Sequence, residues 1–170
     1  MARYDGIRFG HRSDFEAQPA ADLNDFYSRN RGEGFGSEVK RRIALGTYTL
    51  SSGYYDAFYS KACKVRRLLR TDFTNVFSSC DIILSPVTTT SAFKIGERIA
   101  DPVTMYKNDI FTTSTNLAGL PGMSLPVSLS SSGLPVGVQL TGNHFEEKKM
   151  LSLAAKMESL ISFKEKPQNV

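Results

Sequence analysis

The sequence has few cysteines and no long apolar run. Its 170 residues include two cysteines, Cys63 and Cys80, which form no CxxC pair. Two isolated cysteines fit neither a disulfide framework nor a zinc site, so we expect reduced thiols. No apolar segment approaches the roughly 18–20 residues that a helix needs to span a bilayer. Residues 1–6 also lack the apolar core of a signal peptide. We therefore expect a cytoplasmic protein with no membrane association.

Strong charge and clustered histidine are missing as well. The formal net charge is +4, which is compatible with an anionic partner but too small to predict nucleic-acid binding. The two histidines, His11 and His144, are far apart and have no ligand companions, so no metal site is predicted. Hydrophobic residues make up 41% and charged residues 22%. These values are typical of a soluble globular chain of about one domain.

Helical spacing is clearest between about residues 54 and 79. Apolar residues recur there at steps of three and four, which makes one apolar stripe of the kind that faces a core. The stripe consists of Phe58, Ala62, Val65, Leu69, Phe73 and Val76. Lysines and arginines on the other faces are interpreted as a solvated surface.

Shorter signals complete the helical prediction. A short helix begins near Asp22, and another follows Ser37, which we expect to be its N-cap. Asp101 and Pro102 predict the start of a helix that runs to about Thr113. A last helix begins near residue 145. Residues 3–11 are predicted to be extended, 13–21 to be a loop and 32–36 (GEGFG) a flexible turn.

Three short apolar segments predict strands. Residues 81–87 are typical of a buried strand in a parallel or mixed sheet. Residues 123–129 and 136–142 follow, and the Ser-Ser-Ser-Gly segment 130–133 supplies a turn between them. In the last strand apolar and polar or small residues alternate. Three strands cannot complete a sizeable sheet, so we expect neighbouring strands elsewhere in the chain or in another molecule. The fold class is α/β.

Two short motifs resemble catalytic signatures. Ser91 and Lys94 have the S-x-x-K spacing of penicillin-recognising enzymes, in which a helix brings the amine to the hydroxyl. Here the pair falls in a loop pattern, and no S-D-N or K-T-G element follows it. The serine run at 130–132 lacks the lysine and the strand-to-helix context of a phosphate-binding loop. Neither motif predicts a catalytic site.

An amino-acid ligand requires a cation for its carboxylate and a carboxylate for its ammonium group. Arg41 and Arg42 lie early in a predicted helix, where the helix dipole disfavours cations. Asp109 lies one turn after Met105, so a buried Met105 would leave Asp109 partly buried and in need of a cationic partner. From the residues alone, the ordinary interpretations are favoured: a surface arginine pair and an internally paired aspartate.

Longer blocks of sequence resemble one family. The blocks are ARYDGIRFG (2–10), GFGSEVKRRIALGTYTLSSGYYDAFYSKACKVRRLLRTDF (34–73), ILSPVTTTSAFKIGE (83–97), DPVTMYKNDIFTTSTNLAGLPGMSLPV (101–127) and GLPVGVQLTG (133–142). They are similar, in order and over nearly the whole chain, to the A subunits of glutamyl-tRNA(Gln) amidotransferases in the amidase-signature family. The resemblance implies an α/β/α fold around a mixed sheet, of which residues 1–170 form the carboxy-terminal part of a single amidase domain.

The resemblance also implies an activity. These enzymes release ammonia from glutamine and pass it to a partner subunit, which uses ATP and magnesium to activate and amidate Glu-tRNA(Gln). Subunits B and C are the implied partners, and no cofactor is implied for this chain. An arginine of the KRR segment would hold the glutamine carboxylate. Arg42 matches it best, and Arg41 remains the alternative. Asp109 matches the aspartate that holds the ammonium group.

One part of the family pattern is missing. The family uses a serine nucleophile, a bridging cis-serine and a lysine base, which lie in its amino-terminal half, and no such segment occurs here. We therefore expect no catalytic residue in this chain, and inactivity without the missing part. Two alternatives remain open: the carboxy-terminal part of another amidase-signature hydrolase, and a non-catalytic relic or interaction module.

Overall fold

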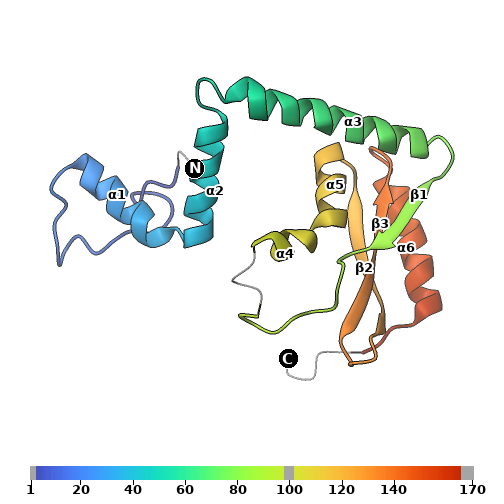
Figure 1. Cartoon of the computed structure of the whole chain (residues 1–170). Coiled ribbons are helices and arrows are strands. Elements are labelled where there is room, and N and C mark those ends of the chain that lie inside the picture. The colour runs from blue at the N-terminus through green and yellow to red at the C-terminus, as the bar shows by residue number, and fades with distance from the viewer. Residues whose placement is uncertain (1–2, 98–101, 166–170) are drawn as a thin grey trace. The chain divides into compact units, whose positions relative to one another are not determined.

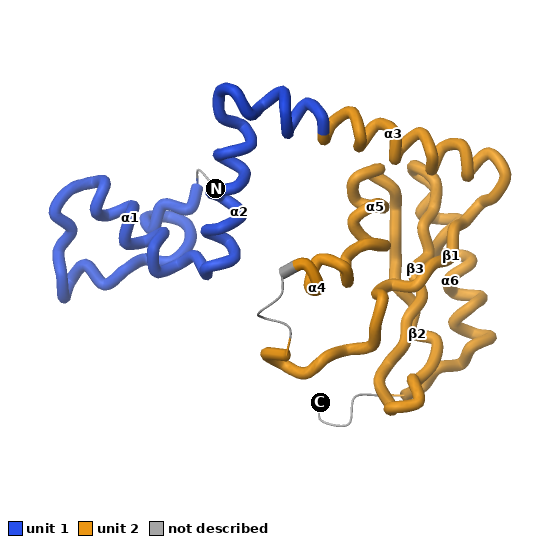
Figure 2. The backbone as a smooth tube through the Cα atoms, in the orientation of Figure 1, with its two compact units in different colours: residues 1–61 blue, residues 62–170 orange. Residues whose placement is uncertain are grey.

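A computed structural model describes residues 3–97 and 102–165 of the chain. The chain divides into two compact units, residues 1–61 and residues 62–170, which Figure 2 shows in different colours. Within the described ranges, every helix is too short or too polar to cross a bilayer.

Unit 1 consists of three helices and an ordered loop. The helices are α1 (Leu23–Gly34), α2 (Ser37–Thr49) and the π-helix η1 (Tyr55–Ser60). The predicted start of α1 is confirmed, since the Asp22 carboxylate accepts a hydrogen bond from the backbone N–H of Asp25. The turn predicted for 32–36 is wrong over 32–34, because α1 continues to Gly34. Tyr4 fixes this end by donating its hydroxyl proton to the Gly34 carbonyl. The N-cap of α2 is Gly36, one residue before the predicted Ser37.

The loop that precedes α1 is closed by side chains. The extended conformation predicted for residues 3–11 is wrong, because the Asp5 carboxylate accepts hydrogen bonds from three following N–H groups. Such bonds bend the backbone into a turn. Asn30 of α1 is fully buried; it accepts from the Ser13 N–H at 2.8 Å and donates to the Asp5 carbonyl at 3.2 Å. Gly6 has φ +71° and lies directly against the Asn30 side chain, where a Cβ would collide with it.

Unit 2 is built on a three-stranded sheet. The strands are β1 (Ile82–Pro86), β2 (Gly122–Leu129) and β3 (Pro135–Gly142), in the order β1-β3-β2. All three predicted strands are confirmed, as is the turn at 130–133, where Gly133 has φ +76°. Both pairings are antiparallel. The parallel or mixed setting predicted for β1 is therefore not present among the described strands; β1 and β2 are both edges.

Four helices accompany the sheet: α3 (Lys61–Val76), α4 (Pro102–Lys107), α5 (Ile110–Ala118) and α6 (Glu147–Ile161). The long helix predicted for 54–79 is realised as η1 followed by α3. The single helix predicted up to Thr113 is wrong. The N–H groups of Asn108 and Asp109 bond three residues back, and Asp109 leaves helical geometry at φ −94° and ψ 5°. Asp109 then serves as the N-cap of α5 without a capping bond from its side chain. Asp101, the predicted N-cap of α4, lies outside the described residues.

Helices α5 and α6 lie on opposite faces of the sheet (Figure 1). Leu140 of β3 forms the core with Met150 and Ala154 of α6. The neighbouring Gln139 and Thr141 contact α5 instead. Because successive strand residues point to opposite faces, the two helices cover different sides. This arrangement is the α/β/α layering that the family resemblance implied.

Much of the apolar surface is uncovered. Phe58, Val65 and Val76 of the predicted stripe are 50%, 49% and 45% exposed. The helical spacing of these residues is confirmed, but the core that they would face is not among the described residues. An amphipathic helix of this kind requires a partner surface.

Candidate functional site

The two arginines that were predicted to bind the glutamine carboxylate lie on the first two turns of α2. Arg41 and Arg42 both bind Glu38, which precedes them by three and four residues and therefore shares their face. Arg41 places its Nε at 2.9 Å and its Nη2 at 2.7 Å from Glu38 Oε2. Arg42 places its Nε 2.9 Å from Oε1. The two guanidiniums thus contact different oxygens of one carboxylate.

The neighbours of the Glu38 carboxylate favour its charged form. The hydrogen bond from Arg42 is the largest cause that lowers the pKa of Glu38 below its usual value. Desolvation opposes this shift, and the hydrogen bond from Arg41 adds to it. Glu38 lies in the first turn of α2, where the helix dipole favours an anion. It thereby compensates for the unfavourable position of the two cations.

Asp109 lies at the start of α5. Its backbone carbonyl accepts from the Thr113 N–H at 2.8 Å and from the Thr112 hydroxyl at 3.2 Å, while its carboxylate makes no capping bond. The condition for its partial burial, an inward-packed Met105, is not met: Met105 is 40% exposed, and Asp109 is exposed as well. The break before α5 ends the shared helical face on which that prediction depended. Among the described residues its carboxylate has no ion-pair partner, so the side chain is accessible to a ligand.

Arg42 belongs to unit 1 and Asp109 to unit 2. Each is exposed on its own unit, and each is a charged group of the kind that a zwitterionic ligand requires. Their joint use by one ligand stays a prediction, as does the preference for Arg42 over Arg41.

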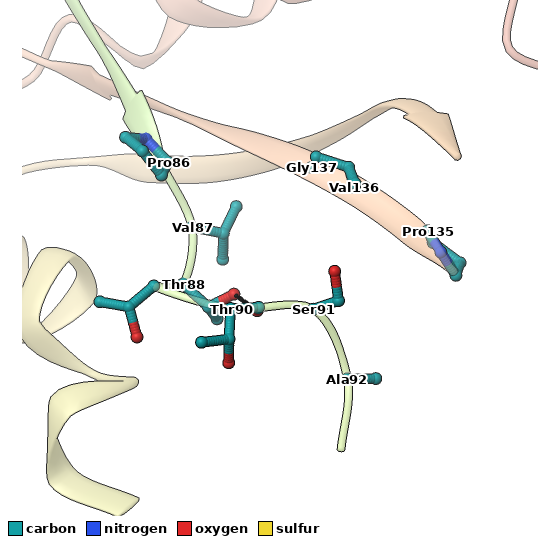
Figure 3. Close-up of a pocket in the computed structure, with 10 residues that line it drawn as sticks. Pro86, Val87, Thr88, Thr90, Ser91, Ala92, Pro135, Val136 and Gly137 are labelled. Carbon is teal, nitrogen blue, oxygen red and sulfur yellow. Dashed lines mark hydrogen bonds between the residues drawn. The ribbon is translucent and has the colours of Figure 1, made fainter. Parts of the chain in front are cut away.

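A threonine-rich loop lies close to Asp109. It follows β1 and, with residues 135–137 of β3, lines a cavity of about 360 Å³ (Figure 3). Thr88 donates its hydroxyl proton to the Thr90 carbonyl, and the Thr89 hydroxyl lies 3.4 Å from the side-chain oxygen of Asn108. The loop therefore contacts the residue that precedes Asp109. The sequence of this segment predicts only a loop and gives no signal for that contact.

A second cavity of about 370 Å³ lies between α5 and the sheet. It is bordered by a buried polar network that sequence analysis missed. Gln139 donates to the Phe111 carbonyl at 3.2 Å, and its amide nitrogen is also 3.2 Å from the Thr115 hydroxyl. Thr115 and Thr141 lie 3.3 Å apart. The alternation along β3 was a usable signal, because it placed Gln139 and Thr141 on the face opposite Leu140.

The S-x-x-K pair and His11 lie in ordinary surroundings. Ser91 and Lys94 lie in the loop after β1, where the backbone N–H of Lys94 donates to the Glu97 carboxylate. His11 of unit 1 contacts Glu33 at 2.9 Å. Within the described part of the chain, no three of the acidic, histidine and cysteine side chains are grouped to hold a metal.

Comparisons with known proteins agree with this architecture. A family model described as Amidase matches residues 1–151. The A subunit of glutamyl-tRNA(Gln) amidotransferase from Bdellovibrio bacteriovorus is 61% identical over all 170 residues, which cover 35% of that protein. The protein of the same name from Thermoanaerobacter pseudethanolicus is 56% identical, again over the full chain and 34% of the relative. The chain thus spans about a third of the length of these relatives.

Solved structures of amidase-family proteins are also similar to this chain. The A subunit of the amidotransferase from Thermotoga maritima superimposes with a TM-score of 0.60 at 48% identity, over 80% of this chain and 30% of that one. A 6-aminohexanoate cyclic dimer hydrolase has a TM-score of 0.63 over 84% of this chain and 32% of its own, at 22% identity, which indicates a shared fold only. With a family model that covers residues 1–151 and relatives more than half identical along its full length, the chain belongs to the amidase family.

Proposed function

We propose that residues 1–170 form the carboxy-terminal part of the glutamine-hydrolysing A subunit of a glutamyl-tRNA(Gln) amidotransferase. One observation carries the proposal: relatives that share this name match the chain continuously, at 61% and 56% identity over all 170 residues. The family alone would allow many amides as substrates. The charges of Arg42 and Asp109 favour a zwitterionic amino acid, because a small neutral amide requires neither charge.

In the proposed enzyme this segment binds and orients glutamine. The Arg42 guanidinium can form paired hydrogen bonds with the α-carboxylate, a geometry for which arginine is suited. The Asp109 carboxylate can accept from the α-ammonium group. Holding both ends of the amino acid fixes the position of the side-chain amide, which is what a nucleophile requires for attack. Both residues therefore act in recognition, and their loss should appear mainly in the KM for glutamine.

The proposed chemistry needs groups that this segment does not provide. A serine nucleophile, a bridging serine and a lysine base would come from the other part of the amidase domain. The exposed stripe on η1 and α3 and the two edge strands fit a surface that packs against that part within one domain. We propose that the released ammonia goes to subunits B and C, where ATP and magnesium support the amidation of Glu-tRNA(Gln) in the cytoplasm.

The first test is glutamine hydrolysis by the purified 170-residue chain. We expect no hydrolysis above the uncatalysed rate, and recovery of activity when the other part of the amidase domain is supplied. Hydrolysis by the chain alone, traced to an acylated serine by mass spectrometry, would overturn the assignment of the nucleophile.

The second test addresses recognition in the reconstituted amidotransferase. Arg42→Ala and Asp109→Asn should each raise the KM for glutamine by at least about tenfold, because each removes a charge-assisted contact. Arg41→Ala should have a smaller effect. Matched controls are Arg70→Ala and Asp72→Asn, which alter exposed charges on α3. An unchanged KM in Arg42→Ala and Asp109→Asn would remove both residues from the site.

A further inference from the structure

Glu38 is the group that connects the two candidate arginines. Its Oε2 accepts from the Nε and Nη2 of Arg41, and its Oε1 accepts from the Nε of Arg42. The family resemblance assigned no role to this glutamate. All three side chains are about half or more exposed, so the arrangement is held by charge and hydrogen bonding rather than by packing.

We propose that Glu38 is a positioning residue for glutamine binding, which holds the Arg42 guanidinium in the orientation that receives the α-carboxylate. The proposal rests on the proposed function of Arg42 as that ligand. Glu38 does not touch glutamine; it acts through the arginine.

Glu38 would favour binding because it reduces the conformational entropy that the Arg42 side chain loses when a ligand binds. A free arginine side chain has several rotatable bonds, and a ligand that binds it must freeze them. The contact from Glu38 Oε1 to Arg42 Nε fixes the side chain before glutamine arrives. A guanidinium has five N–H donors in a planar fork, so one guanidinium can bind an internal carboxylate and a ligand carboxylate together.

The contacts also distinguish Arg41 from Arg42. Arg41 directs two donors at a single oxygen of Glu38, whereas the described contact of Arg42 to Glu38 uses its Nε. The Arg42 side chain is 65% exposed and that of Arg41 is 50% exposed. Arg41 thus binds Glu38 through two donors, and Arg42 has the more exposed side chain of the two.

Charge also supports a role for Glu38. Its single carboxylate lies between two guanidiniums at neighbouring positions. The hydrogen bond from Arg42, ahead of that from Arg41, lowers the pKa of Glu38 below its usual value. Without Glu38, two adjacent guanidiniums would repel one another near a helix N-terminus.

The test is a double-mutant cycle in the reconstituted amidotransferase. Glu38→Ala should raise the KM for glutamine by about two- to tenfold with little change in kcat, because the ligand must now order Arg42 itself. Glu38→Gln should give a smaller rise, since its amide oxygen can still accept from one guanidinium. In an Arg42→Ala background, Glu38→Ala should cause no further rise. The matched control is Glu158→Ala on α6.

One further measurement separates a loss of glutamine binding from incorrect folding. Amidation driven by added ammonium bypasses glutamine hydrolysis, so its rate should be the same in all these variants if they are correctly folded. Suppose that Arg42→Ala raises the KM. If Glu38→Ala in the wild-type background leaves the KM unchanged or lowers it, Glu38 is not a positioning residue. The same conclusion follows if Glu38→Ala raises the KM further in the Arg42→Ala background. If Arg42→Ala itself leaves the KM unchanged, the proposed function of Arg42 fails, and with it the role of Glu38.

Discussion

The two units are stabilised by different kinds of contact. All five buried hydrophobic side chains among the described residues belong to unit 2: Ala118, Leu125, Leu140, Met150 and Ala154. Among the described residues of unit 1, the buried side chains are polar, namely Ser13 and Asn30. Unit 2 therefore has a small apolar core of its own, whereas unit 1 is organised around hydrogen bonds.

Aromatic contacts complete unit 1. Tyr4 and Phe35 lie with ring centroids 4.3 Å apart, and Phe15 stacks on Phe26 at 4.5 Å. The Arg29 guanidinium lies 4.6 Å from the Phe15 ring. These contacts depend on direction, whereas burial in unit 2 depends mainly on area. We therefore expect unit 2 to respond most to lost volume and unit 1 to lost hydrogen bonds.

The largest expected effect is at Leu140, which is 1% exposed at the centre of the core of unit 2. Leu140→Ala should lower the free energy of unfolding by about 2–5 kcal/mol, because it removes buried methyl groups and leaves a cavity. The measurement is urea unfolding of the chain. Leu68→Ala, at a leucine that is 64% exposed on α3, should change it by less than about 0.5 kcal/mol. Equal changes would contradict an apolar core at β3 and α6.

The second effect is at Asn30 and is specific to unit 1. Asn30→Ala removes the partners of the Ser13 N–H and the Asp5 carbonyl. Leaving such groups buried and unpaired costs about 1–3 kcal/mol. Amide hydrogen exchange should accelerate in residues 3–34 and stay unchanged in the sheet. Asn24→Ala, at an exposed position of α1, is the control. If exchange in the sheet accelerates as much as in the loop, the two units do not respond separately.

Sequence reasoning was most successful where a local pattern decides the structure. The strands β2 and β3 and the turn at Gly133 follow from alternation and turn chemistry. It failed where a local hydrogen bond changes the course of the backbone. The Asp5 carboxylate bends a segment that was predicted to be extended. Backbone hydrogen bonds that reach three residues back, from Asn108 and Asp109, divide a segment that was predicted to be one helix. Neither effect changes the apolar periodicity from which the prediction was made.

The residues of the candidate site could not be predicted from local sequence patterns alone. Arg42 and Asp109 were selected by family resemblance, since their local sequence also fits ordinary surface residues. The spacing of Glu38 to Arg41 and Arg42, three and four residues, places the three side chains on one helical face and could have identified the ion pairs. The burial of Gln139 could not be predicted, because it depends on α5 covering that face of the sheet.

The smallest expected effect on stability is at Lys149, which makes an exposed polar contact in unit 2. Lys149 of α6 binds Asp81, just before β1, at 2.9 Å, and Glu146 at 3.0 Å. The hydrogen bond to Asp81, followed by that to Glu146, raises the pKa of Lys149 above its usual 10.5. The folded chain thus holds this proton more tightly than the unfolded chain does. The stabilisation is fully present below about pH 10.5 and is lost as the pH rises through the folded-state pKa.

The Lys149 contact should contribute less than the buried bonds of Asn30, because its side chain is 48% exposed and salt screens it. The free energy of unfolding of the wild-type chain and of Lys149→Met should therefore differ slightly near about pH 9 and converge towards about pH 12. The difference should also shrink at high salt. Lys148→Met, at a neighbouring exposed lysine, should show no such convergence. A difference that is constant across this range would show that Lys149 contributes through packing of its aliphatic stem rather than through its charge.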